Sequence, residues 1–532
     1  MRKFRVLPLV LAVSLAGQAQ AADLMSIARD ALVNNADLAA SRSGYNSVQA
    51  GEDIERGDLL PQVSATGSVT RYNITSSQSS NLAAAGAGAN GGAGGINAGG
   101  GSDNHYTGST VQLQATQALF DATNWYQLEA SKRQTAQEAL NLRVDRQQLL
   151  YNVAQAYFEV LRAKEQLDTL RAEEQAVSRQ LEQVRQQFDV GIVAATDVYE
   201  AQASYDLTRS QRISQESTLQ VNFEALEQLT GKQYSSIDGL ADDMPIERPT
   251  PASQQAWVEM ASSQNLDLLA ARAAVKVARA NLDTSRAGHL PVLSAFANYQ
   301  YGDSDQDNLR GNNEQNQIGL EATIPIYTGG STSAQVRQST YSLEQTQYQQ
   351  ESQLRTAVQQ VRSYYAQTLN NVLSVQAQKR SIESNRSALE ATRNGYEVGT
   401  RNIVDVLQAQ QNLFTAISNY ADARYDYVLN LLSLRQEAGI LDVDTLDVLN
   451  GWLRADKAVL LNFESQGTTG LGIGDDQPDP GMNGPSPLEG SQGGAGQRQL
   501  PPPNRTALPD DNDLNGLGRG GLGRDMSGNT GY

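Results

Sequence analysis

The chain has 532 residues, no cysteine, two histidines and a formal net charge of −18 at pH 7. The absence of cysteine excludes disulfides, thiolate metal sites and a lipid anchor on an N-terminal cysteine, and the excess of acidic side chains disfavours nucleic acid as a partner. The two histidines, His105 and His289, and the serines and carboxylates form no recognisable catalytic pattern. We therefore expect no enzymatic activity, no cofactor and no metal site.

Residues 1–21 have the pattern of a secretory signal peptide. Three basic residues precede an apolar run from Val6 to Ala16, and Ala19-Gln20-Ala21 fits a small-x-small cleavage site. We expect the mature chain to begin at Ala22. No later apolar run reaches the length of a transmembrane helix, so a membrane location would require a β-barrel.

The next feature is an internal duplication. The segment FDVGIVAATDV (188–198) reappears as YEVGTRNIVDV (396–406), and RGDLLPQVSA (56–65) matches RAGHLPVLSA (286–295). Self-similarity of this kind marks repeated structural units. We divide the chain into a first repeat at 22–230, a linker at 231–250, a second repeat at 251–438, an equatorial C-terminal segment at 439–461 and a tail at 462–532. The tail has too few apolar residues to fold, so we expect it to be disordered.

Each repeat begins with a helical pattern and continues with alternating strands. The helical patterns, 24–58 and 254–287, end at a Leu-Pro pair, because the residue before proline is driven out of the α region. Apolar and polar residues then alternate over 62–70 and 111–116 in the first repeat, and over 293–300 and 317–326 in the second. A water-soluble sheet with one buried face and a transmembrane barrel share this pattern.

The connections between these strands favour the barrel. The glycine-rich stretch 82–102 and the polar stretch 303–313 would form long loops at the same end of the sheet, as in outer-membrane barrels. Lipid does not tolerate an open sheet edge, and four strands cannot close a barrel. The strands would therefore be pooled between subunits, eight in a dimer or twelve in a trimer.

Two very long helical patterns follow, from about Ala122 to Phe188 and from about Ser331 to Tyr396. Neither contains proline or an early glycine, and at ~1.5 Å per residue each would measure about 100 Å. Val177, Leu181, Val184 and Phe188 have the spacing of a coiled-coil seam. Each helix turns at a glycine into a shorter return helix, which ends near Thr230 or Ala438.

In type, order and spacing, these segments resemble the TolC family of outer-membrane efflux proteins. The match extends over residues 22–455 and rests on the two tip motifs, RAGHLPVLSA, IPIYTGG and ARYDYVLNLLSL. The resemblance implies an α+β membrane protein: a homotrimer with a twelve-stranded β-barrel in the cell outer membrane, four strands per chain, continuous with a long periplasmic α-helical barrel.

The resemblance also implies a function. The chain would be the passive exit duct for drugs or proteins in a tripartite efflux pump or a type I secretion system. Its partners would be a periplasmic membrane-fusion adaptor and an inner-membrane transporter of the RND, ABC or MFS type. A periplasmic coiled-coil adaptor or structural protein is the alternative, because an adaptor would share the signal peptide and the helical hairpins. However, an adaptor would need a compact lipoyl-like β domain.

The resemblance further assigns roles at the tips of the helical hairpins. It implies a latch that closes the duct, in which Thr196 and Asp197 bond to Tyr396 and Arg401. The planar fork of a guanidinium suits such a latch, since it can bind a carboxylate and a second acceptor together. An ordinary surface ion pair, worth ~0–1 kcal/mol, is the alternative reading of these residues.

Two further assignments concern the pore and the outer surface of the tips. Asp405 would project into the pore near its narrowest point, and Gln408 stands where the family's best-known members carry a second aspartate. A single ring of carboxylates would favour cations only weakly. The residues around the two tip glycines would form an adaptor-docking surface, or would serve the turn alone: Val190, Gly191, Ile192, Val398, Gly399 and Thr400.

Overall fold

The computed structural model describes residues 21–76, 102–304 and 311–460. The signal peptide except Ala21, the glycine-rich insertion except Ser102, and the predicted tail lie outside the described residues. Within the described part of the chain, no helix is both long enough and apolar enough to cross a membrane.

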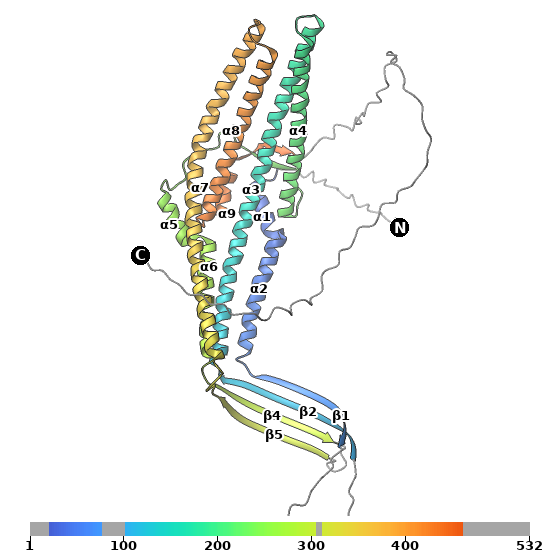
Figure 1. Cartoon of the computed structure of the whole chain (residues 1–532), viewed down its shortest axis with the longest axis vertical. Coiled ribbons are helices and arrows are strands. Elements are labelled where there is room, and N and C mark those ends of the chain that lie inside the picture. The colour runs from blue at the N-terminus through green and yellow to red at the C-terminus, as the bar shows by residue number, and fades with distance from the viewer. Residues whose placement is uncertain (1–20, 77–101, 305–310, 461–532) are drawn as a thin grey trace, which may run out of the picture. The chain divides into compact units, whose positions relative to one another are not determined.

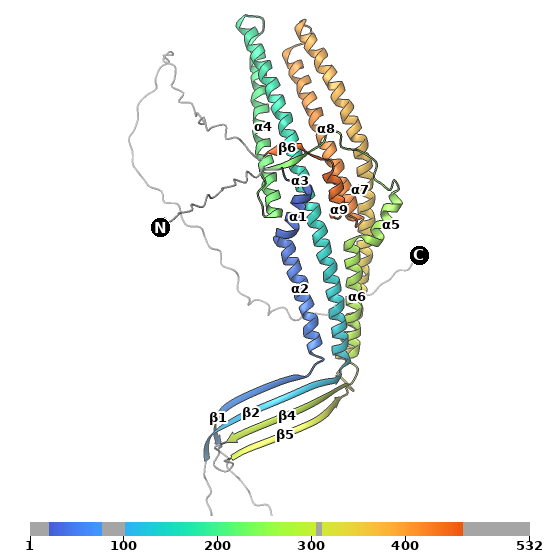
Figure 2. The same cartoon turned by 180° about the vertical axis from the view of Figure 1, so that it is seen from behind.

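The two repeats have the same order of elements, which Figures 1 and 2 show from opposite sides. The first repeat contains α1 (Leu24–Asn34), α2 (Ala36–Gly57), β1 (Gln62–Ser76), β2 (Ser102–Phe120), α3 (Ala122–Asp189) and α4 (Ala195–Thr230). The second contains α5 (Gln254–Gln264), α6 (Leu266–Ala287), β4 (Val292–Ser304), β5 (Gly311–Thr323), α7 (Ser331–Glu397) and α8 (Ile403–Glu437). The long helices α3 and α7 have 68 and 67 residues, which confirms their predicted lengths.

The four predicted strands form one antiparallel sheet in the order β1-β2-β4-β5. Strands β2 and β4, from different repeats, pair with Val111 opposite Tyr301, so the sheet joins the two repeats. The predicted alternation to Ile326 was wrong at its end, because β5 stops at Thr323. Pro325 comes two residues later, and proline can neither donate to a strand ladder nor leave the preceding residue, Ile324, unrestricted.

Each predicted N-terminal helix is broken once, at the same place in both repeats. Asn35 ends α1 and caps α2, and its side-chain oxygen accepts from Leu38 N at 2.9 Å. Asn265 does the same between α5 and α6, accepting from Leu268 N at 2.8 Å. Both asparagines are buried. Their amide groups donate to the ends of the return helices, to Leu229 O at 3.0 Å and Glu437 O at 2.9 Å respectively.

The predicted linker and C-terminal segment contain a second, two-stranded sheet. In it, β3 (Ser236–Leu240) pairs antiparallel with β6 (Leu453–Leu460), which follows α9 (Val443–Asn450). The buried Arg424 of α8 attaches this sheet to the long helices. Its Nη2 donates to Ala241 O at 2.6 Å, and its Nη1 lies 3.3 Å from Glu165 Oε1 of α3.

Two apolar clusters position the helical hairpins. The larger lies where α3 meets α1, α4, α8 and α9, and fully buries Tyr157 and Phe158. The smaller lies near the tips and contains Val177, Leu181 and Val184 of the predicted seam. The fourth predicted seam residue, Phe188, is 44% exposed. It is near the end of α3, where the helix has passed its packing partners.

Candidate functional site at the paired helical tips

The two helical hairpins turn in the same way. At the end of α3, Gly191 has φ +78°, Gly191 N donates to Phe188 O at 2.8 Å, and Ile192 N donates to Gln187 O at 2.8 Å. At the end of α7, Gly399 has φ +77° and the equivalent two bonds are present. This is the Schellman arrangement, in which a left-handed residue satisfies the last carbonyls of a helix. The predicted role of both glycines in the turn is confirmed.

Several apolar side chains on these turns are exposed to solvent. Val190 and Ile192 are 71% and 72% exposed on the first tip, and Val398 is 74% exposed on the second, where Thr400 is also exposed. Both tips lie at the end of the helices opposite the four-stranded sheet (Figure 1). The structure therefore presents the predicted docking residues together on one end. Their role in binding an adaptor stays a prediction.

A hydrogen bond joins the two tips. Tyr396 of α7 donates from its hydroxyl to Gln187 Oε1 of α3 at 2.8 Å. Burial raises the pKa of the Tyr396 phenol, and the nearby charge of Asp197 adds to the rise. In a single chain, the phenol therefore faces the region of Asp197 but uses Gln187 as its acceptor. Among the described residues, no hydrogen bond joins Thr196 or Asp197 to Tyr396, so the predicted direct contact is absent within one chain.

Arg401 and Asp405 lie at the start of α8. The Arg401 side chain is 61% exposed, and its Nη1 lies 3.9 Å from Asp405 Oδ2, a loose ion pair. Asp405 also closes a capping box with Asn402: Asp405 N donates to Asn402 Oδ1 at 2.8 Å, and Asn402 N donates to Asp405 Oδ2 at 3.3 Å. Asp405 thus has a local structural role in addition to its predicted position in the pore.

Gln408 lies one turn further along α8 and is exposed. Its amide donates to Asn412 Oδ1 at 2.9 Å, whereas Ile403, Val406 and Leu407 on the other side of the helix are buried in the smaller apolar cluster. Residues three apart lie on the same face of a helix. Asp405 and Gln408 therefore share the face of α8 that this chain leaves uncovered.

The comparisons with known proteins decide the family. Residues 27–232 and 257–439 match the model of the family described as outer membrane efflux protein, so both repeats are covered. The chain belongs to this family. Outer membrane protein TolC of Vibrio cholerae is 38% identical over 350 residues, covering 65% of this chain and 80% of the relative. TolC of Escherichia coli is 32% identical over 476 residues, covering 87% and 91%.

A solved structure has the same fold. The crystal structure of CusC matches with a TM-score of 0.66 at 22% identity, and the match covers 78% of this chain and 92% of CusC. The efflux protein described here is thus an outer-membrane channel of the kind that serves tripartite efflux pumps and type I secretion, and its helices extend into the periplasm. Family members are trimeric, non-enzymatic channels that work with other efflux components. The alternative of a periplasmic adaptor was wrong.

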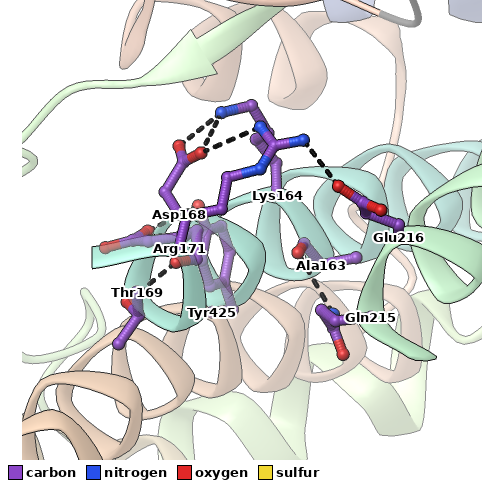
Figure 3. Close-up of polar contacts among 9 residues, drawn as sticks. Ala163, Lys164, Asp168, Thr169, Arg171, Gln215, Glu216 and Tyr425 are labelled. Atoms are coloured by element: carbon purple, nitrogen blue, oxygen red, sulfur yellow. Dashed lines mark hydrogen bonds and ion pairs between the residues drawn. The ribbon is translucent and has the colours of Figure 1, made fainter. Parts of the chain in front are cut away.

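Further from the tips, a charged network holds the helices of this efflux protein together (Figure 3). Arg171 of α3 binds Glu216 of α4 at 2.9 Å, and Lys164 and Asp168 pair on the same side of α3. Tyr425 of α8 donates to Glu165 Oε2 of α3 at 2.9 Å. Burial, followed by the Glu165 charge, raises the Tyr425 pKa. The network ties α3 to both return helices well away from the tips.

Sequence reasoning missed Gln187 and the two helix-breaking asparagines. Gln187 is one of many glutamines on a wetted helix, and its partner Tyr396 is remote in the sequence. Asn35 and Asn265 could have been found, because each follows a short amphipathic stretch and is followed two residues later by Asp, in the segments NADL and NLDL. Asparagine is a strong helix N-cap. The repeat of the same residue at equivalent positions was the available signal.

Proposed function

We propose that this efflux channel is closed at its periplasmic end by its own helical tips. The observation that carries the proposal is the Tyr396–Gln187 hydrogen bond, which joins the α3–α4 hairpin to the α7–α8 hairpin. Because α3 and α7 belong to different repeats, separating the hairpins would break this bond. The contact therefore favours the state in which the two hairpins lie together.

Arg401 supplies the second part of the proposed closure. Its guanidinium is mostly exposed and holds Asp405 only at 3.9 Å, so most of its five donors remain available. Thr196 and Asp197 lie in the first turn of α4, and the Asp197 charge reaches Tyr396. Arg401 would bind these two residues across neighbouring coils of the assembled homotrimer.

We further propose that the exposed tips bind a periplasmic membrane-fusion adaptor, which connects the channel to an inner-membrane transporter of the RND, ABC or MFS type. Val190, Ile192 and Val398 support this role, since apolar side chains more than 70% exposed on a turn have no packing function there. The exported substrates would be drugs, proteins or both.

Single-channel recording in planar bilayers tests the closure. The variant Tyr396→Phe with Arg401→Ser removes both proposed contacts and should conduct more than the wild type at the same voltage. The matched control is Tyr341→Phe with Arg337→Ser, which makes the same changes at exposed positions near the start of α7, far from the tips. Equal conductance of the tip variant and the wild type would refute the closure.

A further inference from the structure

A small cavity lies where the linker between the repeats crosses α8. Its volume is about 140 Å³, and it is lined by linker residues 245 and 247–250, by Trp257 of α5, by Tyr427, Leu431 and Arg435 of α8, and by Trp452 just before β6. The cavity is distinct from the tips and from the charged network of α3. It is open to solvent on one side and is bordered by the linker, by two helices of the second repeat and by the C-terminal segment.

Arg435 brings a positive charge to this cavity. Within the described residues, no carboxylate lies within 4.0 Å of its guanidinium. Burial lowers the pKa of Arg435, and the neighbouring Tyr427 and then Asp442 oppose that effect only in part. Asp442 is engaged elsewhere, because its Oδ1 accepts from Thr445 N and Thr445 Oγ1, both at 2.8 Å. A half-buried charge normally requires an anionic or hydrogen-bonding partner.

Two of the neutral polar side chains of the lining already have hydrogen-bond partners. The Tyr427 hydroxyl is satisfied, since it donates to Glu247 O at 2.9 Å and accepts from Glu247 N at 3.2 Å. The Trp257 indole donates to Pro251 O at 2.7 Å. In contrast, no described residue accepts a hydrogen bond from the side chains of Arg248 or Trp452. The charged residues of the lining are two arginines, Arg248 and Arg435, and one glutamate, Glu247, so the lining carries a net positive charge.

We propose that this cavity binds a small oxyanion, a carboxylate or a phosphate group, held by Arg435 and Arg248. The guanidinium fork can bond two oxygens of such a group at once. A cavity of about 150 Å³ accepts a molecule of the size of benzene, so inorganic phosphate and a monocarboxylate of benzoate size both fit. A bound anion would link the linker to α8 and stabilise the junction between the repeats.

Thermal unfolding of the full-length protein in detergent tests the proposal. Sodium phosphate and sodium benzoate are titrated separately at constant ionic strength, with sodium chloride as the reference. Either anion should raise the transition temperature saturably, since a ligand that binds only the folded state stabilises it. A response to benzoate alone identifies a carboxylate ligand, a response to phosphate alone a phosphate group, and a response to both the shared oxyanion chemistry.

Conservative variants locate the site. Arg435→Lys keeps the positive charge but loses the planar guanidinium, and Arg248→Gln changes an exposed residue, so both variants should fold. Each should weaken anion binding by about tenfold. Arg386→Lys and Arg386→Gln make the same changes on the exposed surface of α7 and should bind as the wild type does. The proposal is overturned if neither anion raises the transition above the chloride reference. It is also overturned if the response is unchanged in Arg435→Lys and Arg248→Gln, which would mean that the anions act elsewhere.

Discussion

Replacement of Asn265 by alanine should destabilise the junction between α5, α6 and α8. The side chain makes three hydrogen bonds: it accepts from Leu268 N at 2.8 Å and donates to Glu437 O at 2.9 Å and, at 3.4 Å, to Glu437 Oε2. The residue is 2% exposed. Loss of an N-cap costs about 1 kcal/mol. A buried carbonyl without its donor costs about 1–3 kcal/mol more. We expect a total loss of about 2–4 kcal/mol in the free energy of unfolding.

The duplication provides an internal replicate of this experiment. Asn35→Ala removes the equivalent bonds, with Leu38 N and Leu229 O, and should cost a similar amount. The two losses should add, because the sites share no partner. Asn394→Ala is the control, since that exposed side chain makes no hydrogen bond with a described residue.

Two measurements suit this prediction. Urea unfolding followed by circular dichroism gives the change in free energy, and hydrogen exchange of the amides around 262–270 shows whether the α5–α6 junction opens locally. If Asn265→Ala and Asn35→Ala unfold at the urea concentration of the Asn394→Ala control, then packing alone holds the helix breaks and the reasoning fails.

Three other predictions concern glycine, pH and the pore. Gly439 and Gly231 both have positive φ, but a Cβ on Gly439 would lie 2.2 Å from Gln264 O, whereas one on Gly231 would lie 3.7 Å from the nearest atom. Gly231→Ala should therefore lower the free energy of unfolding by about 1–2 kcal/mol, and Gly439→Ala should lower it clearly more. Equal urea midpoints for the two variants would contradict this prediction. Burial and the Asp267 charge raise the pKa of Glu437 to about 7 from 4.5. The contribution of Glu437 to stability is thus fully present below pH 4.5 and is lost as the pH rises to about 7. Glu437→Gln should therefore flatten the pH dependence of the thermal transition temperature between these two pH values. An unchanged slope would argue against a buried neutral carboxyl. Gln408→Asp should add a second carboxylate to the uncovered face of α8 and increase cation selectivity. The increase is measured as a larger reversal potential in a salt gradient, with Gln408→Asn as the control. Identical reversal potentials for the two variants would place this face outside the pore.

Much of the fold could be predicted because it is encoded locally. A helix of 68 residues without proline or early glycine, a glycine at each turn and a period of two in the strands are properties of neighbouring residues. The ends were less accurate where local signals competed, as at Pro325, which stops β5 before Ile326. The helix breaks at Asn35 and Asn265 were missed because the apolar pattern continues across them. An asparagine N-cap at both equivalent positions is their local signal, whereas the buried contact of each asparagine with a return helix depends on the tertiary structure.

The candidate site shows the same division. The sequence by itself determined that the two tips are copies, that each needs a glycine and that Tyr396, Arg401 and Asp405 cluster at the second tip. Only the tertiary structure decided that Tyr396 donates to Gln187, that Asp405 caps α8, and that Arg435 lies half-buried beside the linker with no carboxylate of the described residues within 4.0 Å. The physical reason is that periodicity and turn chemistry act between residues close in the chain, whereas the partner of a polar side chain is set by which helices the packing brings together.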